Sequence, residues 1–295
     1  MTSLANGRYL IKEVVTTDLV LCKDKNLDRT VSIQWVTPTS GREAVRSRLA
    51  ALQTVHSPYI ALIYDIVEDK GRIGVVEEEL SSSIQITKAN RFRRLYEFCA
   101  GLAALHEHEI AHGALKMEAF CLGPLDAGRL CKLAFQVSPL CDPSVDRQSF
   151  ASCLDAMGAD MVDDPTFQAL RTRIASSSKP LRSFVQAFRD RLAALLLRDR
   201  HRALLLWRGK STELGVTQRS ARFAHPVANV ASVKVEYDGT RFFLAEVQGE
   251  VRVNNSNLDQ GADLPKSCVI ALGDNTRPWN QRYFITFDQS HPEVP

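Results

Sequence analysis

A long amphipathic segment that runs directly into a histidine-centred loop is the feature that most constrains the fold of this chain. Between residues 91 and 108, apolar side chains recur at the three- and four-residue spacing of a helix, at Phe92, Leu95, Cys99, Leu102 and Leu105. The loop that follows has the sequence H-G-A-L-K-M-E-A-F-C-L, from His112 to Leu122, and leads into a short β-rich segment. We therefore place the other predicted elements around this helix and loop.

The residues before this helix predict a small sheet with one helix. Strands are expected where apolar and β-branched residues stand between turn residues, at Tyr9–Val15, Asp18–Lys23, Thr30–Trp35, Ile60–Val67 and Arg72–Glu77. Residues 42–55 have helical spacing, with Val45, Leu49 and Leu52 on one face. The predicted order is three strands, one helix and two strands.

The residues after the loop predict one more strand segment and then helices. Leu130–Val137 has strand character, and the sequence D-R-Q-S-F-A from Asp146 indicates the start of a helix. We interpret Asp146 as a helix-start residue that caps backbone donors. Two further helices are expected at Thr166–Ala175 and Leu181–Leu197, and Pro180 favours the start of the second.

The His112 loop resembles the catalytic loop of protein kinases, H-R-D-L-x-x-x-N, at His112, Leu115 and Lys116. The segment H-S-P-Y-I-A-L-I-Y-D, from His56 to Asp65, also resembles the H-P-N-I-V segment that follows the first helix of that family. The resemblance covers residues 9–198 or so. It implies an α+β, bilobal fold with a β-rich N-lobe and a helical, shortened C-lobe.

The same resemblance implies that the catalytic loop and the metal site have lost their chemistry. The Asp that accepts the substrate proton falls on Ala114, and the metal-binding Asn falls on Ala119. The Asp of the D-F-G motif falls on Ala134, in Ala134-Phe135-Gln136. A methyl group neither accepts a proton nor binds a cation, so no catalytic residue and no metal are expected.

The phosphate-binding positions are replaced as well. The strand Lys that pairs with the nucleotide phosphates falls on Gln34. Its helix partner, a Glu in the family, falls near Ser47, and Glu43 one turn earlier is the alternative if the register differs. The turn at residues 14–18, where the family has a glycine-rich loop, contains no glycine. We therefore expect a pseudokinase without a nucleotide cofactor.

From about Leu204 the sequence changes from helical to β-rich. Val233–Tyr237 and Arg241–Ala245 alternate around Asp238-Gly239, which predicts a hairpin. Further short strands predict a β-sandwich of about 90 residues. The sequence from Val251 to Gly273 resembles the late strands of forkhead-associated (FHA) domains. The expected division is thus a kinase-like domain at 1–200 and an all-β, FHA-like sandwich at 204–295.

FHA domains bind phosphothreonine through an Arg after Gly, a Ser and an Asn before Gly. Here those positions fall on Val216, Ala228 and Gln248, so the resemblance implies that this site too has lost its chemistry. Four polar residues are expected on the loop side, where they offer candidates for an interaction or a rebuilt anion site: Arg219, Arg222, Asn229 and Asn254.

Composition limits the other classes of function. A net charge of +3 is too small to indicate nucleic-acid binding by itself. No apolar run is long enough for a membrane span, and residues 1–12 lack the pattern of a secretory signal. Seven widely spaced cysteines without a C-x-x-C pair fit reduced thiols in a cytoplasm. His106, His108 and His112 suggest a metal site, but a structural role is favoured because no Cys or carboxylate converges with them in the sequence.

These observations predict a catalytically inactive scaffold or regulatory protein of phospho-signalling, cytoplasmic and, by resemblance, bacterial. Its expected partners are proteins, such as an active kinase, a phosphatase or a phosphoprotein. One alternative is a phosphothreonine-peptide reader that works through the FHA-like domain. The other is an atypical nucleotide-using transferase, whose metal would need Glu118, Asp126 or Asp142. Sequence alone gives no oligomeric state.

Overall fold

The computed structural model describes residues 3–36, 42–80, 84–113, 115–122, 131–133, 145–174 and 176–290. The fold is mixed α+β, with five α-helices and several antiparallel sheets in the described part of the chain. Contacts between residues divide the chain into two compact units, Met1–Leu192 and Ala193–Pro295. The division falls inside the last helix, α5 (Leu181–Leu196), earlier than the boundary expected from the sequence.

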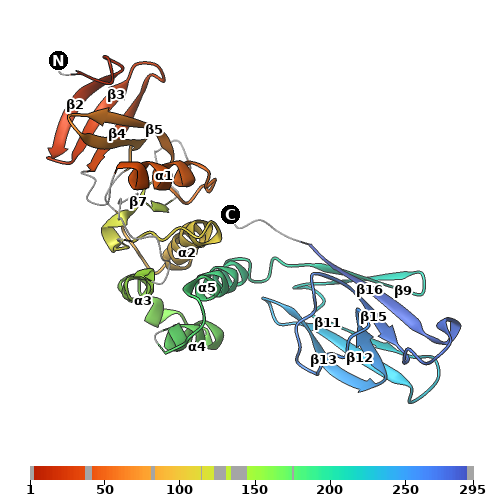
Figure 1. The fold of residues 1–295 in the computed structure, drawn as a ribbon. Helices are drawn as coiled ribbons and strands as arrows, with labels where there is room; N and C mark the ends of the chain where they lie inside the picture. The colour runs from red at the N-terminus through yellow and green to blue at the C-terminus, as the bar shows by residue number, and fades with distance from the viewer. Residues whose placement is uncertain are drawn as a thin grey trace. The chain divides into compact units, whose positions relative to one another are not determined.

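The first unit begins with an antiparallel six-stranded sheet in the order β1-β2-β3-β4-β6-β5 (Figure 1). Its strands are β1 (Ser3–Leu4), β2 (Tyr9–Thr16), β3 (Leu19–Asp24), β4 (Arg29–Val36), β5 (Ile63–Asp69) and β6 (Arg72–Glu78). Helix α1 (Arg42–Gln53) lies between β4 and β5 in sequence and contacts β5. The five strands and the helix expected from the sequence are present, while the two-residue strand β1 was not predicted.

One face of this sheet is closely packed around Gly74 on β6. Val20, Val31, Ile33, Trp35, Val67 and Val76 are among the buried side chains of this cluster. A Cβ at Gly74 would lie 2.8 Å from the Trp35 ring, 2.8 Å from Val67 and 2.9 Å from Ile33. Glycine therefore fits here because neighbouring side chains fill the space that its own would need.

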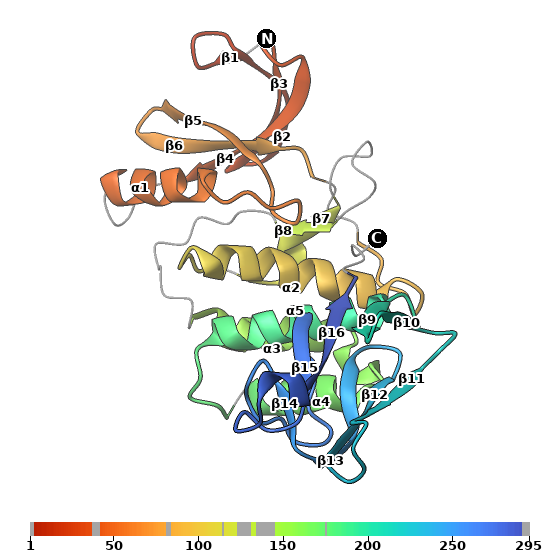
Figure 2. The same ribbon diagram turned by 90° about the vertical axis from the view of Figure 1, so that its right-hand side faces the viewer.

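The second half of the first unit is helical (Figure 2). Its elements are α2 (Arg91–Glu107), the 3₁₀ turn η1 (Met117–Ala119), the antiparallel pair β7 (Phe120–Leu122) and β8 (Cys131–Leu133), α3 (Asp146–Ala156), η4 (Ala159–Met161), α4 (Pro165–Ile174) and α5. The predicted stripe of α2 is buried at Leu95, Cys99, Leu102 and Leu105. Aromatic rings link the layers, because Phe98 contacts Phe120 and Phe150, and Phe150 contacts Phe188.

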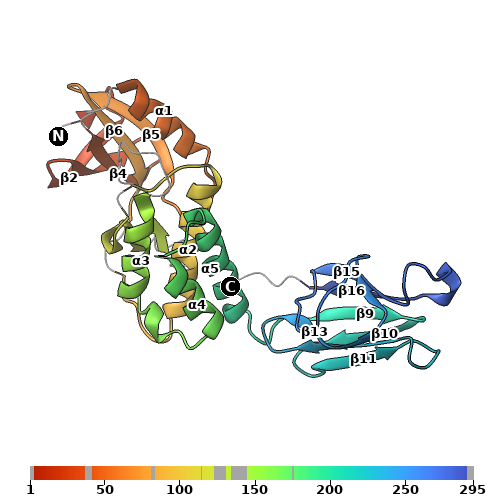
Figure 3. The ribbon, with the colours of Figure 1, turned by 60° about the horizontal axis from the view of Figure 1, so that its bottom comes forward.

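The second unit contains two antiparallel sheets (Figure 3). The five-stranded sheet has the order β10-β9-β16-β15-β14, and the three-stranded sheet has the order β11-β12-β13. The strands are β9 (Ala203–Trp207), β10 (Lys210–Leu214), β11 (Ser220–Ala224), β12 (Ala231–Tyr237), β13 (Phe242–Gly249), β14 (Val251–Val253), β15 (Ser267–Leu272) and β16 (Tyr283–Gln289), with the 3₁₀ turn η5 (Trp279–Gln281). Side chains of both sheets share one core, in which Phe242 packs on Phe287.

The hairpin expected at Asp238-Gly239 is present between β12 and β13. The Asp238 carboxylate accepts hydrogen bonds from the backbone of Thr240 and Arg241, at 2.8 Å and 3.0 Å. An aspartate that binds the backbone two and three residues ahead stabilises a turn. The pair of strands is therefore fixed by its own turn residues, as the sequence indicated.

Because consecutive strands of the second unit run in opposite directions, its loops alternate between two ends. The segment at 199–202 and the loops at 215–219 and 238–241 meet at one end, where Asp199 N donates to Gly239 O at 2.7 Å. The loops at 225–230, 249–250 and 273–282 meet at the other, where Glu250 N donates to Val230 O at 3.0 Å. We call these the Asp199 end and the His225 end.

No helix among the described residues has the length and the apolar character needed to cross a membrane.

Gly74→Ala should destabilise the first unit, although alanine is ordinarily the better residue within a strand. A methyl group at this position overlaps three packed side chains, and overpacking of a core costs about 1–3 kcal/mol. Urea denaturation followed by Trp35 fluorescence, with Trp207 and Trp279 replaced by Phe, measures the change. Ser47→Ala on the exposed face of α1 is the control, and an unchanged urea midpoint for Gly74→Ala would contradict the packing described.

Candidate functional site

The His112 loop is held in place by one buried carboxylate, that of Asp146 at the start of α3. The backbone N–H of His112 donates to Asp146 Oδ2 at 2.7 Å, and the N–H of Gly113 donates to Oδ1 at 2.8 Å. His106 Nε2, at the end of α2, lies 3.1 Å from Oδ2. The sequence suggested that Asp146 caps its own helix. The structure corrects this, since its hydrogen bonds go to the loop and to α2.

The charge of Asp146 is stabilised by these donors. Burial raises the pKa of the Asp146 carboxyl. The hydrogen bonds from His106, Gly113 and His112 lower it by more than burial raises it, so the pKa lies below its usual value. The side chain is 1% exposed, and both of its oxygens accept hydrogen bonds. Asp146 therefore serves as an anchor for the loop, and its oxygens are not presented to a substrate hydroxyl.

Helix α1 contacts the start of the His112 loop through an arginine. Arg48 is buried, and its Nη2 donates to the carbonyl oxygen of Ala111, directly before His112, at 2.8 Å. Ser47, near which the kinase resemblance puts the Glu partner, is exposed, and so is the alternative, Glu43. The inward polar position is thus one residue further along the helix, and it carries a positive charge where the kinase resemblance implies a negative one.

Gln34 lies half-buried on β4, beside Leu19 of β3 and Val75 of β6 in the strand register. Two residues earlier on the same side of the strand, Ser32 Oγ donates to Glu77 Oε1 and to the Glu78 carbonyl oxygen, both at 3.4 Å. Gln34 therefore brings a neutral amide to the position where the kinase resemblance implies a lysine.

A buried ion pair joins the sheet half of the first unit to its helical half. Lys132 Nζ, on β8, lies 2.7 Å and 2.9 Å from the two carboxylate oxygens of Glu78, at the end of β6. Glu78 Oε1 also accepts from the backbone N–H of Leu62 at 2.8 Å, and both charged side chains are buried. The sequence analysis missed this pair because 54 residues separate its members.

The other catalytic positions of the kinase resemblance lie in the His112 loop and after it. Ala119 is buried at the end of η1, and the predictions for Ala114 and Ala134 fall outside the described residues.

Residues 115–118 and α3 line an open hollow of about 430 Å³. Burial raises the pKa of the Cys121 and Cys153 thiols nearby to about 11, so both are uncharged at neutral pH and are poor nucleophiles.

Within the described ranges, no group of three or more His, Cys, Asp or Glu side chains could hold a metal ion. His106 and His112 are buried, with His106 beside Asp146, and His108 follows the end of α2. Asp146 and Glu78 both have their oxygens occupied by donors of the chain itself. The arrangement is therefore suited to holding the loop and the two halves together.

In the second unit, the three positions implied by the FHA resemblance do not lie at one end. Val216 lies in the loop after β10, at the Asp199 end, whereas Ala228 and Gln248 lie at the His225 end. Successive loops alternate between ends, so a loop after β10 cannot meet the loop after β11. This corrects the assignment of Val216, because the strand that enters the His225 end is β11.

The four candidate interaction residues are also separated. Arg219 forms an ion pair with Asp199 at 2.8 Å, and Arg222 forms one with Glu246 across the three-stranded sheet. Asn254 Oδ1 accepts from the backbone N–H of Val269 at 3.0 Å. Asn229 is exposed, with a positive φ of 63° in the loop between β11 and β12. They do not form a joint anion site.

The His225 end is organised by residues that the sequence analysis did not single out. His225 is buried, its Nε2 lies 3.0 Å from Gln281 O, and its Nδ1 accepts from Val227 N at 3.0 Å. Since Gln281 O accepts, the ring carries its proton on Nε2. Gly249 has a φ of 69°, and a Cβ there would lie 2.1 Å from Val230 O. The signals in the sequence were a His-Pro pair and a glycine between two strands.

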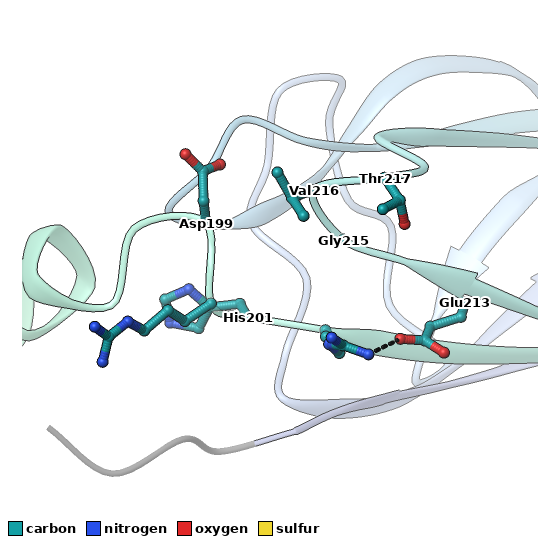
Figure 4. Close-up of a pocket in the computed structure, with 8 residues that line it drawn as sticks. Asp199, His201, Glu213, Gly215, Val216 and Thr217 are labelled. Atoms are coloured by element: carbon teal, nitrogen blue, oxygen red, sulfur yellow. Dashed lines mark hydrogen bonds and ion pairs between the residues drawn. The ribbon is translucent and has the colours of Figure 1, made fainter. Parts of the chain in front are cut away.

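The Asp199 end contains a hollow of about 340 Å³. Figure 4 shows Asp199 and His201 on the segment that leads into β9, and Gly215, Val216 and Thr217 on the loop after β10. Its charges are mixed and partly paired, since Arg202 donates to Glu213 at 3.0 Å. The hollow presents no cluster of a single charge.

A scan of the chain against models of known protein families finds no match. A search of curated protein sequences finds no match either.

Asp146→Asn should remove a pH-dependent part of the stability of the first unit. A carboxyl whose pKa is lowered on folding adds stability that is complete above its unfolded pKa of about 3.9 and is lost as the pH falls through the folded value. The wild-type chain should therefore lose more stability than the variant between about pH 5 and pH 2. Urea midpoints of both proteins across this range measure the difference. Parallel pH profiles would contradict the role of Asp146.

Lys132→Met should destabilise the first unit by about 3–5 kcal/mol, because it leaves the buried Glu78 carboxylate without its cation. The double variant Glu78→Gln with Lys132→Met should recover much of this loss, since Gln keeps an acceptor for Leu62 N. Urea denaturation of the four proteins of the cycle gives the coupling. Lys23→Met, which removes the exposed pair with Asp28, should cost less than about 1 kcal/mol. Additive losses in the cycle would refute the pairing.

Proposed function

We propose that this chain is a catalytically inactive, protein-kinase-like domain joined to an FHA-like sandwich, and that it acts as a scaffold or regulatory protein. The observation that carries the proposal is the order of elements around the anchored loop. Strands β2 to β6, with α1 after the third of them, precede α2, the His112 loop, the β7–β8 pair and α3. This is the order that the resemblance to protein kinases implies, and Asp146 fixes the loop at its centre.

The side chains at the catalytic positions support the inactive character. Phosphoryl transfer by kinases relies on a Lys–Glu ion pair, two metal-binding side chains and a catalytic Asp. Gln34 and Arg48 cannot form that ion pair, because one is neutral and the other positive. Ala114, Ala119 and Ala134 supply neither a base nor a metal ligand. Without them, the charge that develops on a transferred phosphoryl group meets no compensating group.

The buried pair of Glu78 and Lys132 supports the same proposal. In kinases the nucleotide lies between the sheet half and the helical half, and here this pair joins those halves directly. A nucleotide that separated them would expose or unpair two buried charges, which is costly. The pair therefore acts as an internal substitute for a ligand that would otherwise hold the halves together.

The second unit supports the FHA-like part through its two packed antiparallel sheets and its loop ends. Reading of phosphothreonine is the weaker alternative, because Arg219 and Arg222 are each paired with a carboxylate and lie apart from Asn229. A protein partner that is recognised without phosphate fits this unit better.

Thermal denaturation with and without millimolar ATP and Mg²⁺ tests the proposal. The Tm of the full chain should not change, whereas a ligand at 100 times its Kd would stabilise by about 2.7 kcal/mol and raise Tm by several degrees. The double variant of Lys132→Met and Glu78→Gln, which removes the ion pair from the same region, is measured beside the wild type as a matched variant. A rise in Tm of the wild-type chain that requires both ATP and Mg²⁺ would favour the nucleotide-using transferase instead.

A further inference from the structure

The outer face of the five-stranded sheet in the second unit carries large apolar side chains. Leu204 and Leu206 of β9 are 44% and 46% exposed, Val269 of β15 is 39% exposed and Phe284 of β16 is 44% exposed. The alternate residues of β9, Ala203 and Leu205, are buried in the core between the sheets. The outer face of this sheet therefore carries a group of exposed apolar side chains, where an antiparallel sheet with one face in water ordinarily carries polar ones.

The strand register places these side chains together. Leu206 is paired with Thr286, and Thr286 is paired with Val269, so the three form a row across the neighbouring strands β9, β16 and β15. In the same register, Phe284 is paired with Ala271, which is only 3% exposed on this face. We call this surface, formed by Leu204, Leu206, Val269, Phe284 and Thr286, the outer apolar face. Contiguous apolar patches of this kind mark interaction sites.

Charges of opposite sign border the outer apolar face at its two ends. Glu213 and Asp288 lie on either side of Leu204, in the row toward the Asp199 end. Toward the His225 end, Arg282 stacks over the Phe284 ring at 5.1 Å. Because Glu213 is paired with Arg202, the opposite charges that the face offers to a partner are Asp288 toward the Asp199 end and Arg282 toward the His225 end.

We propose that the outer apolar face binds the same face of a second copy of this chain, with the strands of the two copies antiparallel. A two-fold axis across the strands, through the row of Leu206, Thr286 and Val269, places the Asp199 end of each copy over the His225 end of the other. Apolar side chains then meet apolar side chains, and Asp288 meets Arg282. This self-complementarity is what a closed, isologous dimer requires.

The size of the face limits the area that the dimer can bury. Five strands about 4.8 Å apart and five to seven residues long cover roughly 24 Å by 20 Å. This is below the contact of about 800 Å² per partner in a standard stable interface. We therefore expect a weak dimer in exchange with the monomer, whose detection requires a wide range of concentration. The proposal does not depend on the scaffold function, although a dimer would present each docking surface twice.

Sedimentation equilibrium of the full chain, from about 1 µM to about 200 µM, tests the dimer. The average mass of the wild type should rise from one chain toward two across this range. Leu206→Asp should remain a monomer at every concentration, because it buries a charge at the centre of the contact. Val216→Asp, which also replaces an exposed valine but in the loop after β10, should behave as the wild type. A wild type that stays monomeric, or a Leu206→Asp variant that dimerises equally, overturns the proposal.

Two further measurements fix the orientation. Asp288→Lys should weaken the dimer, and Asp288→Lys combined with Arg282→Glu should restore it, since the charges then exchange places. Leu206→Cys places each cysteine opposite its own copy, so oxidation should give a covalent dimer, whereas Val216→Cys should not. Circular dichroism of each variant controls for folding. A double charge variant no tighter than Asp288→Lys, with Leu206→Cys left monomeric, excludes the antiparallel contact.

Discussion

The first unit depends on one carboxylate that three donors keep charged in the interior. Asp146 accepts two successive backbone N–H groups of the His112 loop and faces the His106 ring, so it joins α2, the loop and α3. Burial disfavours the charged form, and the donors more than offset that cost. Because the anchor acts on backbone groups, the loop keeps its path whatever side chains it carries.

The polar side chains around the loop are directed inward rather than toward a ligand. Arg48 binds the carbonyl oxygen of Ala111, and Lys132 binds Glu78 between the two halves of the unit. In an active kinase, charges in this region would meet phosphate and metal. In this chain these charged groups bind the chain itself.

Local patterns predicted much of the fold, and they failed where a decision depended on rotation or on long-range contact. The buried stripe of α2 and the hairpin at Asp238-Gly239 follow from spacing within a few residues, and both predictions are confirmed. On α1, the kinase resemblance indicated a position near Ser47, whereas the buried polar residue is Arg48. One residue turns a helix by about 100°, and a resemblance in sequence does not resolve that rotation. The pair of Glu78 with Lys132 has no local signature, since only the folded sheet and helices bring its members together. Val216 was grouped with Ala228 and Gln248 because sequence resemblance does not show that successive loops alternate between ends.

The close approach of Gly249 to Val230 O, together with the two hydrogen bonds of His225, fixes the loops at the His225 end before any ligand arrives. Loops that are ordered on folding do not lose that conformational freedom again on association. A ligand at this end would therefore meet a template whose shape is already set, and its rate of capture would be governed by diffusion and orientation rather than by loop rearrangement.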